Sequence, residues 1–450
     1  MAIFEKNTEA VEQLLNWFSS TGIAFMLRKC KLPVPQHTNF IVDSFIKIFD
    51  SYLLPLRDEE AKIPKDLMDI VPNYLLFALI WSVGAAVEEN SRPGFSEFAS
   101  KMFTGKDVKM EHKLDLPDDW EPKTLKIKLL ESKSIFDLFY DPVKNIWVNW
   151  QKTIPAYVVP KDAEFHQLTV PTIDCIRLQK FFAMLALNNY HTLFVGPTGT
   201  GKTISIAAEM HSGNFPEDKY VSIQLNFSAQ TSANQTQDII DGKMDKRRRH
   251  YYGPTLKRKA IVFVDDLNMP QKEKYGAQPP IELLRQWMDY GGWYDIHADR
   301  EFRNIQDLLF VAAMSPPSGG RNNVTGRYLR HYNLVYVEPY DATSLSYIFV
   351  NIMSWYFATN TAPAYPRSIE QMKEATVDAT IQVYKEVSDN LLPTPAKSHY
   401  TYNLRDVSKV FQGISVATHK SIRNDGEFVR LWAHECLRVF SDRLINTSDQ

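Results

Sequence analysis

The sequence Gly196-Pro197-Thr198-Gly199-Thr200-Gly201-Lys202-Thr203 is a complete phosphate-binding loop of the form G-x-x-x-x-G-K-[ST]. Residues 191–195 before it predict a short buried strand, and residues 204–210 after it predict the first turns of a helix, the setting that this motif requires. There, backbone N–H groups surround a β-phosphate at a helix N-terminus, where the helix dipole also favours negative charge. Lys202 would reach the β- and γ-phosphates, and the Thr203 hydroxyl would hold Mg²⁺. The competing interpretation is a glycine-rich turn that only caps a helix.

A second acidic motif follows the loop by about sixty residues and has the form of a hydrophobic strand that ends in two acids, Ile261-Val262-Phe263-Val264-Asp265-Asp266. Asp265 would accept hydrogen bonds from Thr203 and from the water shell of Mg²⁺. Asp266 occupies the position of the carboxylate that orients and deprotonates the attacking water in P-loop ATPases of the additional-strand class, where Glu is usual. Asp is one methylene shorter, and a misplacement of about an ångström can cost on the order of a hundredfold in rate. We therefore expect nucleotide binding with slow hydrolysis; the alternative is two carboxylates that cap a strand end.

The fold class follows from the alternation of apolar strands and helices around the loop. Further strands are predicted at residues 220–225, 260–265, 308–314 and 333–337, each separated by enough residues for a crossover. Together with the strand before the loop they predict an α/β domain with a five-stranded parallel sheet. The nucleotide would bind at the carboxyl ends of these strands.

The rest of the chain divides into three further regions. Residues 1–110 are predicted to be helical, with stripes such as Val11, Leu14, Leu15 and Phe18, or Ile41, Phe45, Ile48, Phe49 and Tyr52, facing a core. Residues 111–160 predict a β-containing connector with strands at 124–128 and 147–150. Thr172 or Asp174 is a candidate N-cap for a helix that ends near Leu187. Residues 161–340 form the α/β part, and residues 341–450 are helical with a break at Leu392-Pro393-Thr394-Pro395.

Composition limits the classes of function. The 450 residues carry 51 Lys and Arg against 53 Asp and Glu, so no overall charge selects nucleic acid or an anionic membrane. Cys30, Cys175 and Cys436 are too few and too far apart for a disulfide framework or a zinc site, which favours a reducing, intracellular compartment. The apolar run at residues 74–87 predicts a buried helix, about half the length of a membrane span. The N-terminal residues do not have the pattern of a secretion signal.

One local patch is strongly basic, and it lies at residues 243–250 with Lys246, Arg247, Arg248 and Arg249 in succession. A nucleic-acid site is one interpretation, but we expect an insert between strands without stacking aromatics, which favours a solvated loop or a contact between modules. The histidines show no metal-ligand spacing, and nothing indicates a nucleophilic triad.

The sequence resembles the motor region of dynein heavy chains, most strongly the third of the six AAA+ modules of axonemal dyneins. The resemblance rests on Val264-Asp265-Asp266-Leu267-Asn268-Met269-Pro270, residues 273–286, Gly291-Gly292-Trp293-Tyr294-Asp295, Ala312-Ala313-Met314-Ser315-Pro316-Pro317, Arg327-Tyr328-Leu329-Arg330-His331 and Asn403-Leu404-Arg405-Asp406. It implies that residues 161–340 and 341–450 are the large α/β and small helical lid subdomains of that module. Residues 1–110 would be the helical lid of the preceding module.

The resemblance also implies roles for single residues. Val170 and Pro171 would line the adenine pocket, although ordinary packing explains them equally well. Ser315 would lie at the sensor position at the tip of the fourth strand, where many AAA+ proteins have Asn, and its shorter reach is a second reason to expect slow hydrolysis. Arg405 in the lid would be the second sensor, whose guanidinium contacts the γ-phosphate and couples the lid to the nucleotide state.

Arg327 resembles the arginine finger of AAA+ rings, with Arg330 as the alternate. Such a finger acts in trans on the site of the neighbouring module, and it can supply a factor on the order of 10³ or more in rate. The finger for the site in this chain would come from the next module. We therefore expect slow or absent ATP hydrolysis by the isolated chain.

The resemblance implies an ATP- or ADP-binding, Mg²⁺-dependent regulatory module of a microtubule motor in the axoneme of cilia or flagella, part of the cytoplasmic cytoskeleton. Its partners would be neighbouring AAA+ modules of the same heavy chain, dynein intermediate and light chains in the full complex, and microtubules indirectly through other parts of the motor, with no nucleic acid and no membrane. Two alternatives stay open: a free-standing AAA+ ATPase that oligomerises, and a structural module that holds ADP permanently. A GTPase is disfavoured, because the chain lacks an N-K-x-D motif.

Overall fold

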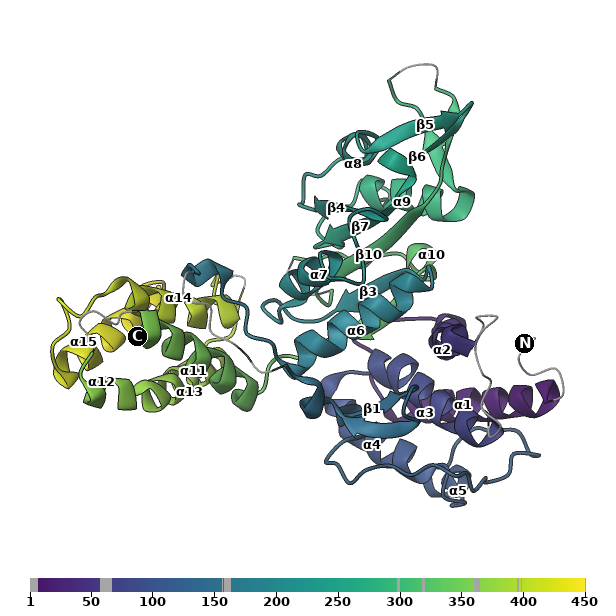
Figure 1. Cartoon of the computed structure of the whole chain (residues 1–450), viewed down its shortest axis with the longest axis horizontal. Coiled ribbons are helices and arrows are strands. Elements are labelled where there is room, and N and C mark those ends of the chain that lie inside the picture. The colour runs from purple at the N-terminus through teal and green to yellow at the C-terminus, as the bar shows by residue number, and fades with distance from the viewer. Residues whose placement is uncertain are drawn as a thin grey trace. The chain divides into compact units, whose positions relative to one another are not determined.

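A computed structural model describes residues 7–56, 67–155, 157, 163–297, 300–317, 320–359, 365–394, 396–397 and 399–449. The chain folds into two compact units (Figure 1). The first contains Met1–Thr153, Ile176–Pro197 and Gly201–Glu338, and the second contains Ile154–Cys175, Thr198–Thr200 and Pro339–Gln450.

The first unit contains the predicted sheet, whose strands are β3 (Thr192–Val195), β4 (Tyr220–Asn226), β7 (Lys259–Asp265), β10 (Leu308–Met314) and β11 (Asn333–Tyr336). Their order in the sheet is β11-β3-β10-β7-β4, and every neighbouring pair is parallel. All residues of β3, β10 and β11 are buried, as expected for strands covered on both faces. The prediction of a five-stranded parallel sheet is confirmed.

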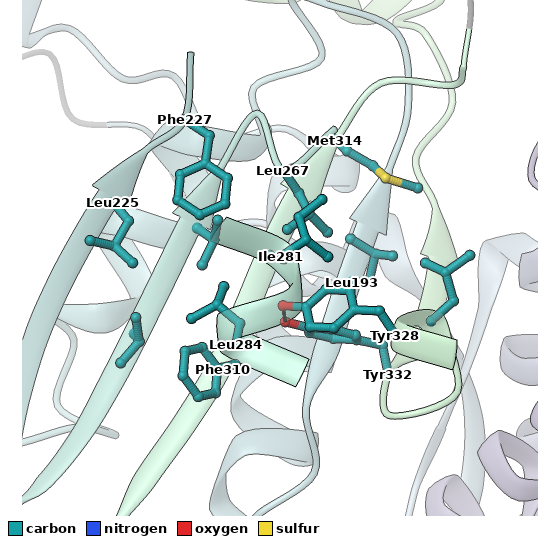
Figure 2. Packing of buried hydrophobic residues seen from close by; sticks show 14 of the residues in the cluster. Leu193, Leu225, Phe227, Leu267, Ile281, Leu284, Phe310, Met314, Tyr328 and Tyr332 are labelled. Carbon is teal, nitrogen blue, oxygen red and sulfur yellow. Dashed lines mark hydrogen bonds between the residues drawn. The ribbon is translucent and has the colours of Figure 1, made fainter. Parts of the chain in front are cut away.

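Helix α6 (Ile173–Leu187) precedes β3. Helices α7 (Lys202–Met210), α8 (Ala233–Asp241), α9 (Pro279–Tyr290) and α10 (Gly326–Leu329) follow β3, β4, β7 and β10 in the predicted alternation. Figure 2 shows how Ile281 and Leu284 of α9 pack with strand residues such as Leu193 and Phe310 in one hydrophobic cluster. At its centre the buried hydroxyls of Tyr328 and Tyr332 are 2.7 Å apart, so each polar group has a partner inside the apolar core.

A second, smaller sheet was not predicted. It consists of β5 (Met244–Arg248), β6 (Tyr251–Pro254), β9 (Phe302–Ile305) and β8 (Gly292–Tyr294), in the order β5-β6-β9-β8. The basic run is therefore mostly an edge strand rather than a loop. Tyr251 directly follows this run, and the Arg248 guanidinium lies 3.8 Å from the centre of its ring.

The N-terminal region of the same unit is helical, as predicted, with α1 (Thr8–Lys29), α2 (Thr38–Leu53), α3 (Leu67–Ser82), α4 (Arg92–Lys101) and α5 (Val108–His112). The α2 stripe is entirely buried, whereas in α1 Val11 and Phe18 are buried and Leu14 and Leu15 are only partly covered. Among the described residues, one helical stretch, Leu67–Ala86, is long and apolar enough to cross a membrane, but 89% of its apolar window is buried inside the protein. It is longer than the predicted run at 74–87, and it serves as a core helix.

The region after these helices contains a hairpin of β1 (Leu138–Asp141) and β2 (Ile146–Asn149). The strand predicted at 147–150 is thus found in β2, and a short helical turn at Trp150–Thr153 follows it. The prediction of a strand at 124–128 is wrong, because Thr124 makes only an isolated bridge to Thr104. Phe181 of α6 packs against Trp81 of α3, with ring centres 4.4 Å apart, and this contact joins the N-terminal helices to the α/β part within one unit.

A buried arginine strengthens the same junction. Arg92 at the start of α4 donates a 2.7 Å hydrogen bond to the Tyr336 carbonyl at the end of β11, and it pairs with Glu338 at 3.1 Å. Since its side chain is almost fully buried, this charge is stabilised by both partners rather than by water.

The second unit is built mainly from α11 (Ala342–Thr359), α12 (Arg367–Gln371), α13 (Lys373–Asn390), α14 (Leu404–Val416) and α15 (Asp425–Cys436) around a core of its own. The predicted break lies between α13 and α14, although Pro395 is outside the described residues. Thr172 is the residue that caps α6, because its hydroxyl accepts a hydrogen bond from the Cys175 amide at 3.3 Å.

The buried His191 makes the stability of the first unit depend on pH. Burial lowers the pKa of His191 to about 3, and its neutral Nδ1 accepts a hydrogen bond from the Phe310 amide at 3.0 Å. Below pH 6.5 His191 of the unfolded chain therefore binds a proton that the folded chain excludes. The free energy of unfolding decreases as the pH is lowered. Between pH 6.5 and 5 this residue alone should lower the free energy of unfolding by about 1.6 kcal/mol.

Urea titrations followed by tryptophan fluorescence measure this slope, because the Trp287 ring centre lies 5.9 Å from His191. His191→Asn keeps an acceptor for the Phe310 amide but does not titrate, so its slope should be shallower in this range. Equal slopes in the two proteins would contradict the assignment.

Candidate nucleotide site

The phosphate-binding loop joins β3 to α7, as predicted. Gly199 and Gly201 have φ angles of +85° and +70°, a conformation that favours glycine. Gly196 is required for a different reason, since a Cβ atom there would lie 2.3 Å from the Val337 carbonyl oxygen of the neighbouring chain segment. The three glycines of the motif therefore allow both the curvature of the loop and its close approach to the sheet.

Lys202 lies at the first residue of α7 and is only 8% exposed. Its ammonium group donates hydrogen bonds to the carbonyl oxygens of Gly196 at 2.9 Å and Pro197 at 2.7 Å. The Lys202 side chain thus folds back over the start of the loop. Its ammonium group lies where it would contact a phosphate chain bound by the loop.

Thr203 and Asp265 meet across the site. The Thr203 hydroxyl donates a 2.7 Å hydrogen bond to Asp265 Oδ2. Burial raises the pKa of Asp265, the nearby Asp266 carboxylate raises it further, and the hydrogen bond from Thr203 opposes both effects. A divalent cation would remove this penalty, because it favours the ionised carboxylate. One hydroxyl and one carboxylate suit Mg²⁺, which takes its other oxygens from phosphates and water.

Asp266 has an unusual backbone conformation. Its φ angle is +51°, which is uncommon for residues other than glycine, although Asp and Asn tolerate it best. Its amide donates a 3.0 Å hydrogen bond to Asp265 Oδ1, so the two acids are held in a tight turn at the end of β7.

Asn268, which the sequence analysis did not single out, fixes the position of Ser315. Asn268 is fully buried, and its Nδ2 donates a 2.8 Å hydrogen bond to the Ser315 carbonyl. Ser315 follows β10 directly, and the preceding Met314 accepts a hydrogen bond from the Gly196 amide at 3.1 Å. The structure therefore brings Gly196, Asp265 and Ser315 to one edge of the sheet, where the sequence analysis expected them. A signal for Asn268 was its polar amide in the otherwise apolar stretch Leu267-Asn268-Met269.

The two candidate finger residues differ in their surroundings. Arg330 and His331 both contact the Asp289 carboxylate of α9, which also accepts a 2.7 Å hydrogen bond from Arg285. Arg327 on α10 is exposed, and it has no hydrogen bond or ion pair within the part of the chain that the structure describes. The Arg327 side chain is thus available to a partner, whereas the Arg330 side chain is held by the Asp289 carboxylate of α9.

Three further candidates belong to the second unit. Val170 is buried in the hydrophobic core of that unit, Pro171 is half-buried beside it, and Arg405 is exposed in the first turn of α14. Gly199, at the tip of the loop, belongs to this unit too, since a Cβ atom there would lie 3.1 Å from the Leu404 amide nitrogen. The packing of Val170 is ordinary core packing, and it leaves the predicted adenine contact as a hypothesis.

Comparison with known families gives three matches along the chain. Residues 11–152 match the dynein heavy chain AAA lid domain, residues 157–340 match the P-loop containing dynein motor region, and residues 357–450 match the dynein heavy chain ATPase lid domain. The loop, Asp265, Ser315 and Arg327 all lie within the second of these matches.

Individual similar proteins indicate the same family as the domain matches. The chain is 39% identical over its whole length to dynein axonemal heavy chain 1 of Mus musculus, and 40% identical over 96% of its length to that of Homo sapiens. It is 37% identical over 99% of its length to dynein axonemal heavy chain 3 of Mus musculus. The chain spans about a tenth of the length of these relatives, 10–11% in each case. The three domain matches in succession and this identity along nearly the whole chain show that it belongs to the axonemal dynein heavy chain family.

Proposed function

We propose that this chain carries an ATP- or ADP-binding, Mg²⁺-dependent AAA+ module, the third of the dynein ring. The observation that carries the proposal is the 2.7 Å hydrogen bond between Thr203 and Asp265 beside a complete phosphate-binding loop. It joins the two side chains that would share one Mg²⁺, while the buried Lys202 supplies the positive charge for phosphates.

Hydrolysis at this site is weak or depends on the ring. Asp266 offers a shorter carboxylate than Glu and is held in a tight turn by its own amide. Ser315 has a shorter reach than the Asn of many AAA+ sensors. Arg327 is exposed on α10, which suits a finger that acts in trans on the preceding module. The finger for this site is then supplied by the module that follows.

The role of the module in the motor is regulatory. Val170 and Pro171 contact the adenine, and Arg405 contacts the γ-phosphate, so the nucleotide state sets the position of the helical lid. Within the second unit, Gly199 of the loop already lies against Asn403 and Leu404 at the start of α14, next to Arg405. The partners are neighbouring AAA+ modules of the same heavy chain, and the setting is the axoneme of a cilium or flagellum, in accordance with the names of the relatives.

Removing the Lys202 ammonium tests the nucleotide site. Lys202→Met keeps the buried stem but loses a charge-assisted hydrogen bond to phosphate, worth roughly 1.5–3 kcal/mol, so Mg-ATP should bind about 10- to 150-fold more weakly. Isothermal titration calorimetry measures this loss. Lys106→Ala removes an exposed lysine elsewhere and should leave the affinity unchanged. Unaltered affinity in Lys202→Met would refute the site.

Asp266 can be tested in two directions in an intact ring. Asp266→Glu should raise turnover at this site, and it should cost about 1 kcal/mol or less in stability, because Glu tolerates a positive φ less well than Asp. Asp266→Asn keeps the backbone preference and removes the carboxylate, so turnover should fall while Mg-ATP affinity stays. If the Glu variant gains nothing, Ser315 or the finger of the next module limits the rate instead.

The finger assignment predicts different outcomes in the full motor for Arg327 of α10 and for Arg330, which follows α10. Arg327→Ala should slow turnover at the preceding module by a factor on the order of 10³ and leave nucleotide affinity here unchanged. Arg330→Ala removes a partner of Asp289, so its main effect should be on thermal stability. Single-site turnover with a matched thermal melt distinguishes them, and equal loss of turnover in both variants would reject Arg327 as the finger.

A further inference from the structure

The basic run of the small sheet has no role in the nucleotide site. Residues 243–258 contain seven Lys and Arg residues and a single acid, Asp245, although the whole chain has a net charge of −2. Five of these cations are exposed; we call them the basic hairpin patch, and they are Lys243, Lys246, Arg248, Arg249 and Lys257. They lie on or beside β5 and β6, which Figure 1 shows next to α8.

Four acids near this hairpin already have partners. Asp307 pairs with Arg247, Glu301 lies 3.1 Å from His250, and Asp241 and Asp295 both pair with Arg303. Within the described part of the chain, none of the five patch residues has an acidic group within 4.0 Å. Asp245 is the one acid within residues 243–258, so the patch keeps an excess of positive charge that no ion pair among the described residues compensates.

Protection of a sheet edge does not account for the patch. β5 is an edge strand, and charged side chains and bulges on such strands prevent unwanted pairing. The register of β5 indeed shifts between Lys246 and Arg248, which already disrupts the edge. Lys243, Arg249 and Lys257 lie outside β5, where they protect no strand.

The aromatic side chains of the hairpin do not favour nucleic acid. Single-stranded nucleic acid needs free ring faces on which bases stack. The Tyr251 ring is covered by the Arg248 guanidinium at 3.8 Å, and the Tyr252 ring has the Arg303 guanidinium 5.0 Å from its centre. Each ring therefore has a guanidinium over one face, and the exposed ammonium and guanidinium groups of the patch are charges that can pair with carboxylates.

We propose that the basic hairpin patch docks an acidic, extended peptide segment. Carboxylates spaced along such a segment would pair with Lys246, Arg248 and Arg249, and Lys243 and Lys257 would extend the contact beyond the strand. This inference goes beyond the nucleotide site and does not depend on it.

The test uses the whole chain and a fluorescein-labelled peptide of alternating Glu and Ser, about ten residues long, roughly twice the ~17 Å length of a five-residue strand. Fluorescence anisotropy should show binding that weakens with ionic strength. The combined variant Lys246→Glu, Arg248→Glu, Arg249→Glu should bind at least tenfold more weakly. Lys106→Glu, Lys128→Glu, Lys420→Glu is the matched control, because it makes the same charge change at exposed lysines elsewhere, and it should change the affinity less than twofold.

Three results would overturn the proposal. Equal weakening in the two variants would mean that the peptide senses only overall charge. Tighter binding of a thymidine oligonucleotide of the same charge, through the same three residues, would assign the patch to nucleic acid. Loss of self-association in the patch variant, measured by sedimentation, would assign it to a second copy of this chain. If the charge-reversal variant melts early, Lys246→Ala with Arg249→Ala replaces it, with the same expected direction.

Discussion

The hydrogen bond from Thr203 to Asp265 joins two elements that are sixty residues apart, the first turn of α7 and the end of β7. Three backbone bonds support it: the Gly196 amide to the Met314 carbonyl, the Leu267 amide to the Ala313 carbonyl, and the Phe227 amide to the Asp265 carbonyl. Each of these amides lies one or two residues past the end of a strand, so the bonds extend the sheet beyond its strands. The start of the loop at Gly196 and the acids that follow β7 are therefore held by the sheet itself.

The parallel sheet and the loop could be predicted because their physical constraints are local. Strands buried on both faces read as continuous apolar runs, as in Ile261-Val262-Phe263-Val264, and such runs are hard to confuse with a surface segment. The acids at the strand end and the glycines of the loop need no distant partner to be recognised. The edge at which Asp265, Ser315 and Gly196 meet follows from parallel topology alone.

The parts that could not be predicted depend on distant partners. Residues 124–128 alternate apolar and polar side chains like a strand, but only Thr124 meets a bridge partner, Thr104, so no sheet forms. The reverse error occurred at β5. Its charged residues Lys246, Arg247 and Arg248 do not have the pattern of a strand, yet β5 pairs with β6. Asn268 was missed because its side-chain amide acts through a hydrogen bond to the Ser315 carbonyl, which is 47 residues away in the sequence. β pairing and buried hydrogen bonds are set by tertiary contacts that a local pattern does not contain.

The backbone conformation at position 266 favours Asp over Glu. A residue with φ of +51° bears a steric cost, and Asp bears it better than Glu because its short side chain can bond to nearby backbone. A longer carboxylate would reach further toward a water molecule but would strain the same turn that presents Asp265 to Thr203. Under the proposed roles of Asp265 and Asp266, metal binding and water activation would place opposite demands on one tight turn. The conformation of this turn would then favour metal binding, at the expense of the reach of the Asp266 carboxylate.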